Sequence, residues 1–185
     1  TELYNTITWT NPRLQCPDIA DDIVAYNIYY AETTADKLQV IYKQPVADGF
    51  TYFHFPVNGL LGCYAVTSVD SLGNESILSN SVCVDNCPFY ELPNTFTPNG
   101  DGFNDVFKPK VNLFVYQIDL KVFNQWGNLV FETQDPDINW NGTNSSGTML
   151  ADGTYYYTCK VLENRVTGIK ESKNILTGFI HLIKN

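Results

Sequence analysis

The chain has 185 residues and a formal net charge of −9 at pH 7, with 44% hydrophobic but only 17% charged residues. This acidity argues against nucleic acid or an anionic membrane surface as a partner, because both are bound through basic patches. Twelve Tyr, eleven Phe and many Thr and Val favour strands over helices, so a globular all-β protein is expected. No apolar run approaches the roughly 20 residues of a membrane-spanning helix. We expect the chain to be part of a longer protein, because Thr1 falls inside a strand pattern.

Six short strand patterns fill the first half of the chain. Each alternates in polarity or is rich in β-branched and aromatic residues. They span residues 3–10, 23–31, 38–42, 50–57, 63–69 and 77–84. The last two flank the turn at residues 71–74 and are expected to form a hairpin. Short strands with a turn signal about every 8–12 residues are typical of an immunoglobulin-like antiparallel β-sandwich.

The five cysteines are interpreted as a partial disulfide framework. Cys63 and Cys83 lie at equal distances from the hairpin turn, which places them opposite each other on neighbouring strands. Cys16 and Cys87 are then free to pair, and Cys159 is left as a free thiol. Disulfides indicate an oxidising compartment. The alternative is a set of five reduced thiols.

Several residues of the first half occur in the order found in one known family. They are Trp9 in the first strand pattern, the run at residues 25–30, Leu60 with Tyr64, and the turn at residues 69–76. This arrangement resembles a fibronectin type III domain, with its early core tryptophan, third strand, penultimate strand and last turn. Little chain precedes Trp9, so the family's first strand is expected to be missing or vestigial. The resemblance implies a spacer or adhesion module, and the fold alone implies no ligand.

The natural domain boundary lies at residues 85–93, which contain two prolines and Cys87. Prolines and a cysteine tether favour a stiff joint over a free linker. We therefore expect two domains, at residues 1–88 and 89–185.

The stretch at residues 94–107 follows this boundary and alternates short polar side chains with glycines. Its oxygen atoms recur at every other residue, a spacing that suits a loop wrapped around a hard cation such as calcium. The candidate ligands are Asn99, Asp101, the carbonyl of Phe103, Asn104 and Asp105. The alternative is a set of Asx-turns, in which the same side-chain oxygens accept hydrogen bonds from backbone amides.

The rest of the second half again reads as strands. Residues 116–123 and 129–132 alternate in polarity and flank a turn, residues 154–163 alternate over ten positions, and residues 174–184 form a largely apolar final strand. Lys160 marks the solvent side of its strand, so Cys159 is expected to be buried. Trp140 is expected to anchor a polar loop in the core. A second antiparallel sandwich is predicted, so the fold class is all-β with two consecutive immunoglobulin-like sandwiches.

Four motifs of this half occur in a fixed order over about 95 residues. They lie at residues 92–107, 122–127, 152–157 and 178–183. Together they resemble the gliding-motility-associated C-terminal domain, the type B sorting domain of the type IX secretion system. Asn141 departs from the pattern, because the family more often has aspartate there.

The resemblance implies a secretion signal without catalysis. Such a domain directs a large secreted or cell-surface cargo, an adhesin or an enzyme, across the outer membrane of a Gram-negative bacterium. The implied partners are outer-membrane components of the type IX translocon, including a barrel-type partner protein, and the isolated fragment is expected to be a monomer. No nucleophile motif, phosphate loop or catalytic carboxylate pair supports an enzyme.

We expect the final strand and the adjoining loop at residues 99–105 to form the recognition surface. An apolar strand at a sheet edge is suited to strand addition by a partner. The candidate residues are Ile175, Gly178, Phe179, Ile180, His181, Leu182 and Ile183. The alternative is that this strand is simply a core strand.

A second function remains open from the sequence, namely a calcium-dependent adhesion or carbohydrate-binding tandem. In that case, exposed aromatic residues such as Trp126 or those at residues 155–157 would stack on sugars.

Overall fold

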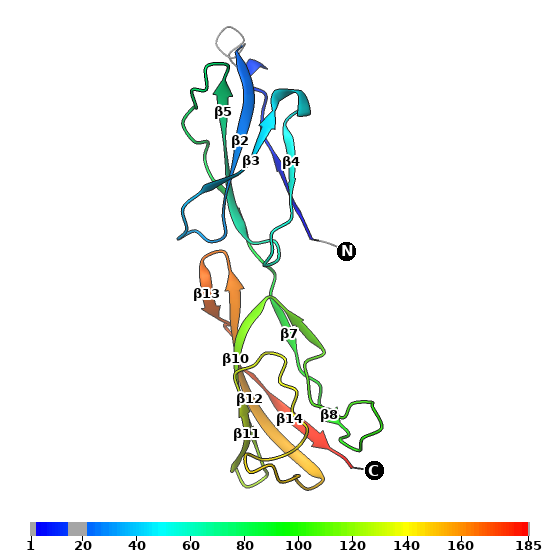
Figure 1. Ribbon diagram of the computed structural model, residues 1–185. Helices are drawn as coiled ribbons and strands as arrows, with labels where there is room; N and C mark the ends of the chain where they lie inside the picture. The colour runs from blue at the N-terminus through cyan, green and yellow to red at the C-terminus, as the bar shows by residue number, and fades with distance from the viewer. Residues whose placement is uncertain (1–2, 15–21, 185) are drawn as a thin grey trace. The chain divides into compact units, whose positions relative to one another are not determined.

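The structure is a computed structural model that describes residues 3–14 and 22–184 (Figure 1). Within these ranges every regular element is a strand, apart from two short 3-10 helices, η1 (Pro12–Leu14) and η2 (Val46–Asp48). Neither of these described helices is long and apolar enough to cross a membrane. The expected all-β class is therefore confirmed.

The chain divides into two compact units, each assembled from two segments. The first unit comprises Thr1–Asn86 and Arg165–Gly168, and the second comprises Cys87–Asn164 and Ile169–Asn185. The division falls two residues before the domain boundary expected between residues 88 and 89. No sequence pattern indicated that the four residues Arg165–Gly168 belong to the first unit.

Six strands form two antiparallel sheets in the first unit, as an immunoglobulin-like sandwich requires. The larger sheet has the order β3-β2-β5-β6, and the smaller one pairs β1 with β4. The strands are β1 (Asn5–Thr8), β2 (Ile23–Ala31), β3 (Gln39–Pro45), β4 (Thr51–His54), β5 (Gly62–Asp70) and β6 (Val82–Val84).

The β5–β6 hairpin carries the disulfide between Cys63 and Cys83, which face each other in its register. This is the pair that the symmetry of the turn predicts. Strand β6 is shorter than the pattern at residues 77–84 indicates. Before Val82, the chain bonds to β5 only at intervals, for example through the Ser79 backbone amide and the Val66 carbonyl, which are 3.0 Å apart.

Strand β1 pairs with β4 on one side, and no described strand lies along its other edge. Just after β1, the indole N–H of Trp9 is buried and has no hydrogen-bond partner among the described residues. The sandwich of the first unit is therefore open at this edge within the described ranges.

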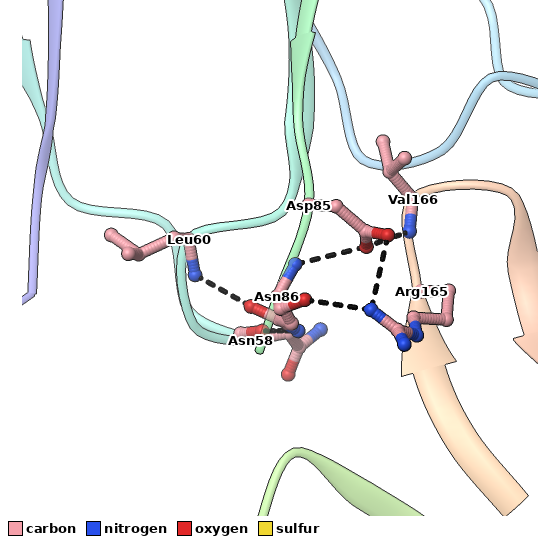
Figure 2. A network of polar contacts seen from close by, with 6 residues as sticks. All are labelled: Asn58, Leu60, Asp85, Asn86, Arg165 and Val166. Carbon is pink, nitrogen blue, oxygen red and sulfur yellow. Dashed lines mark hydrogen bonds and ion pairs between the residues drawn. The ribbon is translucent and has the colours of Figure 1, made fainter. Parts of the chain in front are cut away.

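A polar network closes the end of the first unit (Figure 2). The side chain of Asn86 is buried, and its Oδ1 accepts a hydrogen bond from the Leu60 amide at 2.9 Å. Asp85 accepts a hydrogen bond from the Val166 amide at 2.8 Å, and Arg165 donates to the Asn86 carbonyl at 3.0 Å. Because buried polar groups are costly unless they are hydrogen-bonded, these contacts make the Arg165–Gly168 segment an integral part of the first unit.

The second unit contains one large sheet and one two-stranded sheet. The large sheet has the order β11-β10-β12-β14-β8, with β13 paired to β12, and the small sheet pairs β7 with β9. The strands are β7 (Phe89–Glu91), β8 (Thr95–Phe96), β9 (Val111–Leu113), β10 (Val115–Phe123), β11 (Leu129–Thr133), β12 (Gly153–Arg165), β13 (Gly168–Glu171) and β14 (Leu176–Leu182).

The core of the second unit is built on aromatic residues. Trp140 is only 2% exposed and contacts the rings of Phe96, Phe107, Phe131 and Tyr155. Its indole N–H donates to the Thr143 carbonyl at 2.7 Å, which fixes the polar loop to the core as expected. Apolar residues of β10, β12 and β14 complete this core through the alternation of their strands.

The expected joint at residues 85–93 proved to be more than a linker, because it contains strand β7. Cys87 has a free, exposed thiol in the structure. Its predicted partner, Cys16, lies outside the described residues, so that pairing stays a prediction. Cys159 is a buried free thiol, as expected, and burial raises its pKa to about 12.

Candidate functional site

The loop between Phe96 and Phe107 is fixed at both ends in the core. Both phenylalanines are buried, and their ring centroids lie 5.8 Å apart. The backbone of Phe107 also exchanges hydrogen bonds with that of Trp140, at 2.7 and 3.1 Å. The loop therefore starts and ends at defined positions beside β8.

Within this loop, the Asp105 carboxylate accepts hydrogen bonds from three backbone amides. Its Oδ1 is 3.1 Å from the Asn99 nitrogen and 2.6 Å from the Gly100 nitrogen, and its Oδ2 is 2.8 Å from the Gly102 nitrogen. These bonds, above all those from the two glycine amides, lower the pKa of Asp105. Gly100 and Gly102 adopt left-handed φ values of 81° and 87°, a conformation that glycine tolerates best.

The other candidate calcium ligands also accept hydrogen bonds within the loop. Asn99 Oδ1 accepts from the Asp101 amide, and Asp101 Oδ1 accepts from the Phe103 amide at 2.8 Å. The Phe103 carbonyl accepts from the Thr97 hydroxyl, and the Asn104 carbonyl accepts from the Thr97 amide. The contacts of Asn99, Asp101 and Asp105 are those that the Asx-turn alternative predicts. In the described ranges, no group of three or more His, Cys, Asp or Glu side chains converges as a metal site would require. Calcium binding stays a prediction.

Strand β14 lies between β12 and β8 in the sheet (Figure 1). It pairs with β12 along its whole length, from Leu176 to Leu182. On its other side, β8 covers only the C-terminal end, at His181 and Leu182. Strand β14, which we expected at the sheet edge, therefore has a free edge only over its first half.

The seven candidate recognition residues differ in burial. Ile180 and Leu182 are fully buried in the core, so the core-strand alternative holds for these two. A Cβ added at Gly178 would lie 2.8 Å from the Tyr157 hydroxyl oxygen, so the glycine makes room for that side chain. The remaining residues are exposed or partly exposed and are Ile175, Phe179, His181 and Ile183.

The backbone of β14 presents unpaired groups along its open half. The amides of His181 and Ile183 donate to the carbonyls of Asn94 and Phe96, so these odd-numbered residues direct their backbone groups away from β12. Because the direction of the backbone N–H and C=O groups alternates along a strand, these groups of Thr177 and Phe179 also point away from β12. In the part of the chain that the structure describes, nothing hydrogen-bonds to their N–H and C=O groups on that side.

The aromatic residues considered for sugar stacking differ in their exposure to solvent. Trp126 is 75% exposed at the turn between β10 and β11. Of the three consecutive tyrosines, Tyr155 is buried and Tyr156 is exposed. The exposure of Tyr156 agrees with the alternation of its strand, in which Lys160 marks the solvent side.

Comparison with known proteins identifies one family. Residues 90–182 match the model described as the CHU_C type IX secretion signal domain. No characterised protein sequence shows a significant match to the chain.

Three solved structures resemble the chain at low identity. The FN1–FN3 domains of chicken CNTN1 have 11% identity and a TM-score of 0.35, covering 99% of this chain and 63% of that chain. The fibronectin(III)-like modules of Clostridium thermocellum CbhA have 13% identity and a TM-score of 0.27, covering 100% and 87%. Dimeric latent PorU from Porphyromonas gingivalis has 15% identity and a TM-score of 0.28, covering 91% of this chain and 17% of that chain. TM-scores this low carry no functional information.

Proposed function

The chain belongs to the family of the CHU_C type IX secretion signal domain, and we propose that a barrel-type outer-membrane component of the translocon recognises it along β14. Residues 90–182 are a type IX secretion signal domain, which is a non-catalytic module. Such a signal implies interaction with the secretion machinery and export across the outer membrane to the cell surface or the medium.

The proposal extends to the cargo and to the first unit. The signal serves a secreted or cell-surface protein of a Gram-negative bacterium, either an adhesin or an enzyme, and the first unit acts as a spacer beside it. The unpaired backbone groups of Thr177 and Phe179 carry the proposal for β14, because an open strand edge is a ready template for pairing with another chain.

Export of a reporter tests the function. The full chain is fused behind a reporter that has its own inner-membrane export signal, in a bacterium with a type IX system. We expect the reporter at the cell surface or in the medium, and in the periplasm of a strain that lacks the translocon. Equal export in both strains would contradict the function.

Site-specific photo-cross-linking tests the partner. A cross-linking residue at position 177 is expected to capture a barrel-type translocon component, whereas position 116, an exposed tyrosine on β10, serves as the control. Capture at position 116 alone would contradict recognition along β14. Deletion of residues 175–185 is a poorer test, because it removes Ile180 and Leu182 from the core.

One observation favours a second function, namely the exposure of Trp126 at a hairpin turn. An exposed indole is suited to stacking on a sugar ring. A glycan array probed with and without a chelator tests this alternative, and Trp126→Ala is expected to abolish any genuine signal. A signal that Trp126→Ala leaves unchanged would rule out stacking at this residue.

A further inference from the structure

Four large apolar side chains form one continuous row across the large sheet of the second unit. Phe123 on β10 faces Leu129 on β11 and Tyr156 on β12, and Tyr156 faces Phe179 on β14. Directly paired residues project from the same face of a sheet, so these four side chains lie side by side across neighbouring strands. We call them the apolar row.

The apolar row lies on the face of the sheet that points away from the core. The neighbours of its members along the strands, Val122 and Ile180, are fully buried on the opposite face. Leu129, Tyr156 and Phe179 are 47%, 52% and 43% exposed, and Phe123 is partly buried. Leaving large apolar surfaces in water contributes nothing to folding, and contiguous exposed apolar surface often marks an interaction site.

The residues that border the row on the outer face are mainly threonines. Thr154, Thr158 and Thr177 border Tyr156 and Phe179, together with His181, whose ring centroid lies 4.9 Å from that of Phe179. Lys121 lies on the same face two residues before Phe123, opposite Thr158, and pairs with Asp119 at 3.6 Å. The surface around the row therefore selects an uncharged, apolar partner segment.

The row ends at the open edge of β14. Phe179 is both its last member and one of the two residues whose backbone N–H and C=O groups point outward without a partner among the described residues. A strand that added to this edge would place one of its own side chains beside Phe179 on the same face. The open edge and the apolar row thus provide backbone pairing and side-chain contact for the same segment.

We propose that an extended, apolar segment of the type IX translocon adds to β14 at Thr177–Phe179 and packs a large side chain against the apolar row. This inference rests on the proposed function and deepens it, because it names the surface and the chemistry of the segment that binds. The row then works as the specificity element, and the strand edge supplies affinity that depends little on sequence.

The test uses the full-chain reporter fusion with single substitutions. Tyr156→Ser and Phe179→Ser remove members of the row, and Thr177→Pro removes an outward N–H at a position where proline suits an edge strand. Tyr116→Ser is the matched control, because Tyr116 is 55% exposed on β10 but outside the row. Thermal unfolding of each purified variant establishes that it folds.

We expect Tyr156→Ser, Phe179→Ser and Thr177→Pro each to lower export about tenfold or more, as loss of a central anchor does in other interfaces. The control is expected to be exported like the wild type. Normal export of the folded row variants would overturn the role of the row, and normal export of folded Thr177→Pro would overturn strand addition.

Two further results separate this inference from its alternatives. If the wild-type fusion is not exported at all, the proposed function itself fails.

A second copy of the chain is the alternative occupant of the edge. If sedimentation shows a dimer of the purified chain that Thr177→Pro dissociates, the edge is a self-association surface, and the translocon proposal is overturned. A monomer supports it.

Discussion

The two units stabilise similar β-sandwiches by different means. The second unit buries large apolar side chains around Trp140, including both phenylalanines that flank its long loop. The first unit has a smaller apolar cluster and combines it with the Cys63–Cys83 disulfide and with buried polar residues such as Gln44 and Asn86. Apolar packing is insensitive to redox state, whereas a disulfide is broken by reduction. We therefore expect the two units to unfold under different conditions.

The largest expected effect is loss of the aromatic core of the second unit. Trp140→Ala is expected to destabilise this unit by about 3–5 kcal/mol, because it leaves a cavity among the surrounding rings. Hydrogen exchange followed by mass spectrometry measures the two units separately, and peptides from β10 and β14 should lose protection. If peptides from β2 and β5 lose as much protection, the units do not have independent cores.

Removal of the disulfide should affect the first unit instead. Cys63→Ala combined with Cys83→Ala is expected to cost about 3 kcal/mol, because the cross-link closes a loop of 20 residues. Urea unfolding of the double variant and of the wild type, under reducing and oxidising conditions, measures this loss in the free energy of unfolding. An equal loss of stability in the second unit, or none in the first, would contradict the contrast between the units.

Acidification should also act on the first unit before the second. His54 is partly buried with its Nδ1 2.8 Å from the Tyr64 hydroxyl oxygen, and burial lowers its pKa. Its unfolded pKa is near 6.5, so the unfolded state binds more protons once the pH falls below that value. The contribution of neutral His54 is therefore fully present above about pH 6.5 and is lost as the pH falls through its folded pKa.

In the second unit, Asp105 is a carboxylate with a lowered pKa. Its contribution is present above the unfolded pKa of about 3.9 and is lost only as the pH falls through the lower folded value. Hydrogen exchange between about pH 7 and 4.5 should show weakening of the first unit alone, and His54→Gln should flatten that dependence. Unchanged pH dependence in His54→Gln would exclude His54 as the cause.

The smallest expected effect concerns calcium at the second unit's loop. If the loop binds the ion, millimolar calcium raises the unfolding temperature of this unit, because a ligand of the native state stabilises it. Asp101→Asn should then weaken the rise, and Asp119→Asn, outside the loop, should not. Calorimetry that shows no shift with calcium leaves the Asx-turns as the sole role of these side chains.

The long strands of the second unit could be predicted from the sequence. Alternation over Ile118, Leu120 and Val122 is strong enough to define β10 and its buried face. The brief strands β7, β8, β9 and β13 were missed, because two to four residues carry no periodicity and their pairing is decided by distant segments.

The candidate site could also be predicted only in part, because alternation within one strand is visible in the sequence but pairing between strands is not. Alternation from Lys160 already placed Tyr156 on the solvent face, and the motif at residues 178–183 pointed to β14. The apolar row depends on the registers of four strands, which no single stretch of sequence contains. The inclusion of the Arg165–Gly168 segment in the first unit likewise depends on long-range contacts with Asp85 and Asn86.

The central claim is that this chain carries a type IX secretion signal, and the location of the full-chain reporter fusion tests it most directly. Fractionation of cells with an intact translocon should place the reporter at the surface or in the medium, whereas cells without the translocon should retain it in the periplasm. Retention in the periplasm of both strains, with the fusion intact and folded, would contradict the claim.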